Sequence, residues 1–469
     1  MGYPLEPDEA QMRELGEAAL SFVVERIRSL PDVQAVGGEG FEGLLERYRG
    51  GPPEEGGALG LQLESLALAI EKSFNTAGPG YLAYIPGGGL FTAAVADFIA
   101  LGVNRYVGLW EPAPLLVQIE QSVIRWLCDL FDFPADARGF LPSGGSMANF
   151  SALVTARKAM LPEKRFPDGA FYVTEQTHAS VAKAASLAGF PRYGARMVST
   201  TPEYRMDVDE LRVMIRNDRA SGRKPFLVVA SAGTTNTGTV DPIAELARLC
   251  ELEGMWLHVD AAYGGFFQLT DRGRERFAGI ERASSITLDP HKGMFLPYGT
   301  GCLIVRDGAA LRFAHQIQAE YLQDLAPDGE LPNFSEYSPE LSREFRGLRV
   351  WLPLQLHGVG AFRAALDEKL DLARTIHESL SETPGFEVAV EPDLSIVAFR
   401  YTPTSGDADE FNRALLERVN ASKRVFLSST TLDGRFTIRA AVLSHRTHRD
   451  RIEEAIDIIR SAAQEMGKA

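Results

Sequence analysis

A lysine follows a short apolar segment, in a place where a charged side chain is unfavourable. Residues 285–288 form a predicted strand that Asp289 and Pro290 end, and Lys292 comes next, before a second predicted strand over residues 301–305. Such a lysine is either an ion-pair partner with a buried stem or an amine with a chemical role. Ion pairs are the commoner case for a single lysine, so the residues nearby must decide.

Three other features favour the chemical role. Asp260 ends the apolar segment 255–260, and a buried carboxylate needs a cationic or strongly hydrogen-bonding partner. The small residues over 142–149 (PSGGSMAN) open a predicted helix, so free backbone N–H groups and the helix dipole form an anion site there. His178 lies at the head of another helix, after the strand predicted at 171–174.

An amine, a buried carboxylate and an anion-binding turn are the groups that pyridoxal 5′-phosphate (PLP) requires. Lys292 would form a Schiff base with the cofactor. Asp260 would keep the pyridine nitrogen protonated, so that the ring accepts electrons.

Four motifs in this order carry a family resemblance. They are SGGSMAN at 143–149, THAS at 177–180, HVDAAYGG at 258–265 and LDPHK at 288–292. Together they resemble the group II PLP-dependent amino acid decarboxylases, which include the aromatic amino acid, histidine and glutamate decarboxylases. The resemblance implies a PLP-dependent enzyme of fold type I that decarboxylates an L-amino acid to an amine and CO2.

The resemblance also implies site residues. His178 would stack on the cofactor ring, although a histidine there is also an ordinary helix cap. His291 would transfer protons or hold the phosphate region. The implied catalytic residues are Lys292, His178, Asp260 and His291. The implied cofactor-binding residues are Gly145, Ser146, His178, Thr234, Asp260, Ala262, His291 and Lys292. No metal site is expected.

Five residues are candidates for substrate binding: Tyr84, Trp110, Phe334, Tyr337 and Arg439. Their aromatic members favour an aromatic amino acid as substrate. Each has an alternative, since Tyr84 also fits a surface turn, Trp110 fits the core, and Arg439 would either meet a substrate carboxylate or tie two domains together.

Two positions depart from the family pattern. Asp289 falls where some members carry asparagine near the phosphate, and a carboxylate there would repel a phosphate unless it turns away. Residues 322–339 form a predicted lid, in which Phe334 occupies the place of a proton-donating tyrosine, with Tyr337 three residues on. The alternative reactions are therefore an aldehyde synthase or a carbon–carbon lyase of the sphingosine-phosphate type.

Strands and helices alternate from residue 139 to residue 305, which predicts an α/β fold whose mostly parallel sheet has helices on both faces. Ligands bind at the carboxyl ends of such strands. An N-terminal helical segment (1–78), a large PLP-binding domain (79–350) and a small C-terminal α+β domain (351–469) are expected. The predicted strands of the large domain are 171–174, 195–199, 226–231, 255–260, 285–288 and 302–305, and those of the small domain are 386–390, 394–400, 425–429 and 435–440.

Composition excludes several classes of protein. The 469 residues carry a formal charge of −15 without any basic block, which argues against nucleic acid as a partner. Three scattered cysteines give no disulfide framework, and no apolar run reaches the roughly 18 to 20 residues that span a membrane. A cytoplasmic enzyme is expected. Its short N-terminal helices (12–30, 41–48 and 61–74) need a surface to cover, which predicts a homodimer.

Overall fold

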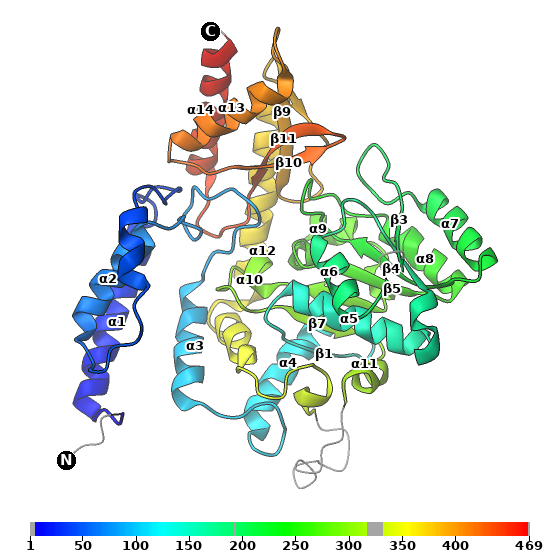
Figure 1. Cartoon of the computed structure of the whole chain (residues 1–469), viewed down its shortest axis with the longest axis horizontal. Helices are drawn as coiled ribbons and strands as arrows, with labels where there is room; N and C mark the ends of the chain where they lie inside the picture. Colours follow the sequence, from blue (N-terminus) through cyan, green and yellow to red (C-terminus); the bar gives the residue numbers. More distant parts are fainter. Residues whose placement is uncertain (1–4, 192–193, 317–331, 468–469) are drawn as a thin grey trace.

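The computed structural model describes residues 5–191, 194–316 and 332–467. A seven-stranded sheet forms the centre of the large domain, in the order β1-β7-β6-β5-β4-β2-β3 (Figure 1). The strands from β6 to β3 run parallel, whereas β7 is antiparallel to both β6 and β1. The mostly parallel α/β sheet predicted from the sequence is therefore confirmed. The strands are β1 Arg138–Phe140, β2 Gly169–Val173, β3 Ala195–Met197, β4 Lys224–Ser231, β5 Trp256–Ala261, β6 Ser285–Leu288 and β7 Cys302–Val305.

Helices pack on this sheet because its central strands are buried along their whole length. Every residue of β2, β5, β6 and β7 is buried. Helix α5 packs on β4 to β7, and α8 packs on β4 and β5. The helices of the domain are α3 Phe91–Val103, α4 Pro114–Leu130, α5 Gly145–Met160, α6 Ala179–Leu187, α7 Val208–Ala220, α8 Ile243–Glu253, α9 Asp271–Arg276, α10 Pro290–Gly293 and α11 Gly308–His315.

The register of the sheet brings three strand ends together. Ser231 at the end of β4 pairs with Asp260 of β5, and Asp260 pairs with Thr287 of β6. Because these strands are parallel, the residues that follow them, including Lys292 in α10, emerge on the same edge of the sheet.

The C-terminal part has its own antiparallel sheet, in the order β10-β11-β9-β8, and its own hydrophobic core. Residues from the 80s join it, since Leu82 is in this core and its backbone bonds to Phe426 and Ala441. The elements are α12 Arg346–Ser381, β8 Phe386–Val388, β9 Ile396–Tyr401, α13 Ala408–Ala421, β10 Ser428–Leu432, β11 Arg435–Ala441 and α14 Arg449–Gly467. The predicted boundary after residue 350 falls inside α12, so the domain limits stay a prediction.

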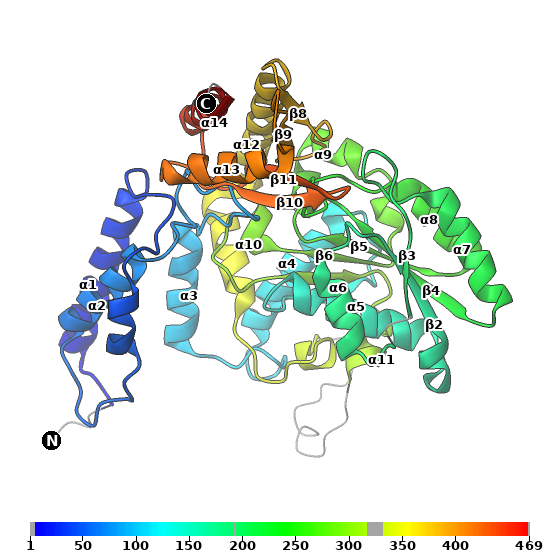
Figure 2. The same cartoon turned by 45° about the horizontal axis from the view of Figure 1, so that its top comes forward.

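Helices α1 (Glu9–Ser29) and α2 (Leu59–Glu71) lie together at one edge of the molecule, beyond α3 and away from the large sheet (Figure 2). Neither contains a buried residue. A 3-10 helix, Glu42–Tyr48, connects them where an ordinary helix was expected. No helix in the described parts of the chain is both long and apolar enough to cross a membrane.

Candidate active site

A cavity of about 280 Å³ lies at the carboxyl ends of β4, β5 and β6. Its lining comes from the turn before α5, the start of α6, the loop after β4, the end of β5 and helix α10. All eight residues predicted to bind the cofactor line it: Gly145, Ser146, His178, Thr234, Asp260, Ala262, His291 and Lys292. Segments more than 140 residues apart in the chain thus meet in one place, as the rule for strand ends predicts.

Lys292 is held by a neighbouring carboxylate. Its Nζ lies 2.8 Å from Oδ2 of Asp289, one helical turn earlier, and the Asp289 side chain is almost fully buried. Within the described residues, Oδ1 of Asp289 has no hydrogen-bond partner. The aspartate that departs from the family pattern therefore turns toward the lysine.

The first turn of α5 offers backbone N–H groups to an anion. No side chain in the described structure caps this helix, whose N-cap is Gly144. The N–H groups of Gly145 and Ser146 have no acceptor within the helix itself. A Cβ on Gly145 would lie 2.9 Å from Oδ2 of Asp289, which is too close. Glycine therefore allows the turn to approach the Asp289 carboxylate.

Asp260 has only neutral partners in the described structure. Asn149 Nδ2 donates to its Oδ2 at 2.8 Å, and the Ala262 N–H donates to its Oδ1 at 3.1 Å. Asp260 is 8% exposed, and no described lysine, arginine or histidine forms an ion pair with it. A cationic group entering the cavity would compensate this buried charge.

The two histidines of the cavity are fixed by hydrogen bonds. His178 caps α6, because its Nδ1 accepts from the Ser180 N–H at 3.2 Å, and it also faces the cavity, so both roles considered for it are compatible. His291 Nδ1 donates to the Thr300 carbonyl at 2.7 Å. Burial lowers the pKa of His291, despite the nearby Asp289, and favours the neutral imidazole.

Thr234 lies in a network of hydroxyl groups after β4. Its Oγ1 is 2.8 Å from that of Thr237, which is 2.7 Å from that of Thr239. The preceding Gly233 has φ +100°, and a Cβ there would lie 2.7 Å from the Tyr263 ring, so the turn that presents Thr234 requires glycine.

The five substrate candidates do not line the cavity of the single chain. Phe334 is fully buried, with the Arg343 guanidinium 4.7 Å above its ring, and Tyr337 is 9% exposed. Trp110 is half-buried and its backbone N–H donates to Asn333. Residues 322–331 of the predicted lid lie outside the described residues.

Arg439 connects the two domains. Its guanidinium donates to the carbonyls of Tyr84, Thr235 and Asn236 and to the Ser428 hydroxyl. Burial lowers its pKa to about 10, so it remains charged at neutral pH. The hydrogen bonds to Thr235 and Asn236 link the C-terminal sheet to the loop after β4, which is one of the two roles considered for this arginine.

Several cavity residues were not singled out in the sequence. Asn149 and Ser180 line the cavity, and His258 lies behind it, although all three belong to the motifs quoted above. Tyr298 does not line the cavity, but its ring centroid lies 5.8 Å from that of the cavity residue His291, and it is 56% exposed. Position within the motifs was the signal for the first three, whereas Tyr298 follows the motif and only the structure shows its neighbour.

Residues 63–402 match the family model described as the pyridoxal-dependent decarboxylase conserved domain. The chain belongs to the pyridoxal-dependent decarboxylase family. It is 35% identical to an aromatic-L-amino-acid decarboxylase of Bacillus atrophaeus, over 99% of this chain and 98% of the relative. It is 26% identical to a phenylacetaldehyde synthase of Arabidopsis thaliana, over 98% of both chains.

The solved structure of Oryza sativa TDC with PLP and tryptamine has the same fold, at a TM-score of 0.94 and 26% identity, and the match covers 99% of this chain and 100% of that one. The decarboxylase is thus a fold type I enzyme and a PLP-dependent carboxy-lyase, as the motifs predicted.

The cavity of this decarboxylase fits the cofactor on its own chemistry. The uncapped start of α5 suits the phosphate, and the buried Asp260 carboxylate suits a protonated ring nitrogen. Lys292 supplies the only lysine amine among the cavity residues described. When bound, PLP supplies an electron sink for the pair left behind as the bond between Cα and the carboxylate breaks.

Proposed function

We propose that this decarboxylase converts an L-amino acid with an aromatic side chain to the corresponding amine and CO2, with Lys292 as the lysine that carries the cofactor. The observation that supports this most is the meeting of Lys292, Asp260 and the start of α5 in one cavity. The aromatic preference is supported by the Bacillus atrophaeus relative, an aromatic-L-amino-acid decarboxylase.

The residues of the cavity have distinct roles in this proposal. Asp260 holds the proton of the ring nitrogen, and Gly145 and Ser146 bind the phosphate. His178 lies against the ring, where its Ser180 contacts fix its orientation. Lys292, paired with Asp289, would carry the cofactor, and its amine would be available to transfer a proton once the substrate is bound. His291, neutral and hydrogen bonded to Thr300, lies beside it.

A second candidate reaction keeps the cofactor and changes the product. Phe334 has no hydroxyl, and a phenylacetaldehyde synthase is among the relatives of this chain. The alternative is oxidative: the amino acid, O2 and water give the aldehyde, CO2, ammonia and H2O2. O2 is reduced to H2O2 as the carbon that bears the amino group is oxidised.

Product analysis separates the two reactions. The PLP-loaded enzyme would be incubated with each proteinogenic L-amino acid, and CO2, amine, aldehyde and H2O2 would be measured. The proposal predicts CO2 and an equal amount of amine from aromatic substrates, without H2O2. Aldehyde and H2O2 in equal amounts would establish the oxidative reaction instead. Release of CO2 from aliphatic or acidic amino acids alone would overturn the aromatic preference.

Phe334→Tyr is the matched variant for this assay. If Phe334 decides the outcome, the restored hydroxyl shifts any aldehyde product toward amine, whereas Tyr337→Phe leaves the ratio of products unchanged. Lys292→Ala is the control for cofactor-dependent turnover in both reactions.

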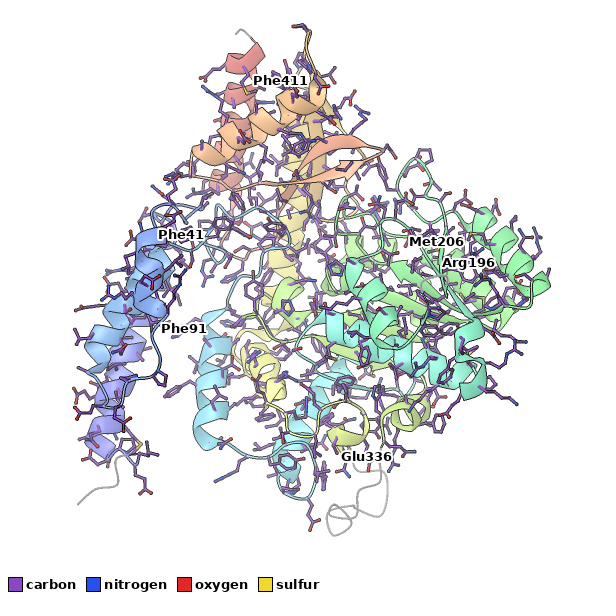
Figure 3. The ribbon with its side chains drawn as sticks, in the orientation of Figure 1. Phe41, Phe91, Arg196, Met206, Glu336 and Phe411 are labelled. Carbon is purple, nitrogen blue, oxygen red and sulfur yellow. The ribbon has the colours of Figure 1, made fainter. Side chains whose placement is uncertain are left out.

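We also propose that the enzyme is a homodimer, with the N-terminal helices at the interface. Leu20 and Val24 on α1, Leu66 on α2 and Phe98 on α3 are each about half or more exposed, and Phe41 lies at the same edge of the molecule (Figure 3). Exposed apolar side chains on three neighbouring helices favour burial against a second copy of the chain. The cytoplasmic location and the absence of nucleic-acid and membrane partners remain predictions from the sequence.

A further inference from the structure

Asn149 is a junction between two residues of the proposed cofactor site. One Nδ2 hydrogen is donated to Asp260 Oδ2 at 2.8 Å, and the other to the Ser180 hydroxyl at 3.0 Å. On its other side, Oδ1 of Asn149 lies 3.0 Å from His258 Nε2. Asn149 is 3% exposed, so these contacts are shielded from water.

The partners of Asn149 determine which group donates in each hydrogen bond of the series from Asp260 to Ser285. An ionised Asp260 only accepts, so the amide nitrogen of Asn149 must face it and the amide oxygen must face His258. That oxygen also only accepts, so His258 Nε2 carries the hydrogen. His258 Nδ1 then carries no hydrogen, and it accepts a hydrogen bond from the Ser285 hydroxyl at 2.8 Å.

This series of hydrogen bonds begins at the indole of Trp256. Trp256 Nε1 donates to Ser285 Oγ at 2.8 Å, and an indole N–H is only a donor. The hydrogen bonds therefore run in one direction, from Trp256 through Ser285, His258 and Asn149 to Asp260. Such a series polarises its members in the same sense and strengthens the last donor.

His258 must be neutral for this arrangement to hold. Burial lowers its pKa to about 4, although Asp260 opposes the shift. Thr287 Oγ1, at 3.4 Å, is another neutral group that contacts its Nε2. A neutral imidazole with one hydrogen fits the single donor and the single acceptor that its neighbours require.

The second branch reaches His178. The Ser180 hydroxyl, which accepts from Asn149, lies 2.8 Å from His178 Nδ1 and donates to it. The Ser180 N–H points to the same nitrogen. Nδ1 of His178 is thus an acceptor, and Nε2 carries the hydrogen of the neutral ring.

We propose that Asn149, oriented by His258, is a positioning residue that aligns the Asp260 carboxylate for the cofactor's ring nitrogen. This inference rests on the proposed placement of that nitrogen at Asp260. Without Asn149, the Ala262 N–H is the one remaining hydrogen-bond donor to Asp260 among the described residues. The carboxylate is then free to turn away from the ring nitrogen, which weakens the charge-assisted hydrogen bond between them.

Binding of two ligands to the same protein tests this role without any turnover. The ligands are PLP and its 1-deaza analogue, in which C–H replaces the ring nitrogen. For each protein the two dissociation constants are measured by absorbance titration, and their ratio, Kd of the analogue over Kd of PLP, reports the contact between Asp260 and the nitrogen. Asn149→Leu preserves size, and His258→Phe preserves a planar ring without a donor.

The expected ratio is well above one in the wild type and falls about tenfold in Asn149→Leu, with a smaller fall in His258→Phe, because a charge-assisted hydrogen bond is weakened. Ser151→Ala, a buried change on the same helix at a hydroxyl without a hydrogen-bond partner among the described residues, leaves the ratio unchanged. If Asn149→Leu does not unfold cooperatively and is therefore misfolded, the fall of the ratio in His258→Phe tests the proposal instead.

Two results overturn the inference in different ways. If both dissociation constants rise in Asn149→Leu and His258→Phe while their ratio stays at the wild-type value, Asn149 has only a structural role. If the ratio is near one in the wild type and in Asp260→Asn alike, the ring nitrogen does not lie at Asp260. In that case the proposed placement fails, and the inference fails with it.

Discussion

The Asp260 carboxylate accepts two hydrogen bonds and has no cationic partner in the described structure. In Asp260→Asn the cavity keeps its shape but loses the charge that holds a protonated ring nitrogen. We expect kcat to fall at least about a hundredfold, as for the loss of a preorganised electrostatic contact. Single-turnover assays at saturating cofactor measure this, and a loss below threefold would contradict the role.

His258 gives the protein an acid-sensitive stability. Burial lowers its pKa from 6.5 to about 4, so between these values the unfolded chain binds the proton and the folded one does not. The free energy of unfolding should therefore decrease as pH falls from about 6.5 to about 4, by up to about 1.4 kcal/mol per pH unit from this residue.

Urea titrations of His258→Phe over this pH range should show a shallower dependence than the wild type. His315 and His445, whose pKa values burial also lowers, keep part of the slope. An identical slope in His258→Phe and the wild type would show that His258 is charged in the fold.

At the same scale, the sequence predicted the cofactor side of the site and left the substrate side open. Lys292, Asp260 and Gly145 follow strands or open a helix, so local pattern and strand-end geometry place them together. Phe334 and Arg439 lie in segments whose position depends on how distant parts of the chain pack, which local pattern does not encode.

Helix α12 contains a break that one glycine permits. Gly358 has φ +70° and ψ 156°, a backbone conformation outside the helical region, and no atom lies where its Cβ would be. Gly358→Ala should lower the free energy of unfolding by about 1–2 kcal/mol through backbone strain. Gly360, two residues on, also has open space around it and is not restricted to positive φ.

Gly360→Ala is thus the matched control, and it should be neutral or stabilise by up to about 1 kcal/mol. Denaturant midpoints of the two variants provide the comparison. Equal stabilisation of both would mean that α12 is continuous through residue 358.

Some of the short strands were predictable and others were not. The bounds of β6 and β7 agree with the strands predicted from the sequence. Strand β1 has only three residues, and α3 is apolar on several faces, so neither gave a clear periodicity. The strand predicted at 425–429 lies at Ser428–Leu432, because the backbone of Phe426 instead bonds to Gly80 and Leu82.

At the scale of the whole molecule, the exposed apolar edge predicts association. Leu20→Glu with Leu66→Glu, on α1 and α2, should shift the enzyme from a mass of twice 51.3 kDa toward one chain in sedimentation experiments. Leu252→Glu changes an 84% exposed leucine on α8 and should leave the mass unchanged. A single-chain mass for the wild type at every concentration would rule out the dimer.

The central claim is that one cavity binds PLP through Lys292. Borohydride reduction of the PLP-loaded enzyme, followed by digestion and mass spectrometry, tests it most directly because reduction fixes the cofactor to its lysine. The cofactor mass should appear on the peptide that contains Lys292, and no such peptide should appear from Lys292→Ala. Labelling of another lysine in the wild type, with Lys292 unmodified, would contradict the account.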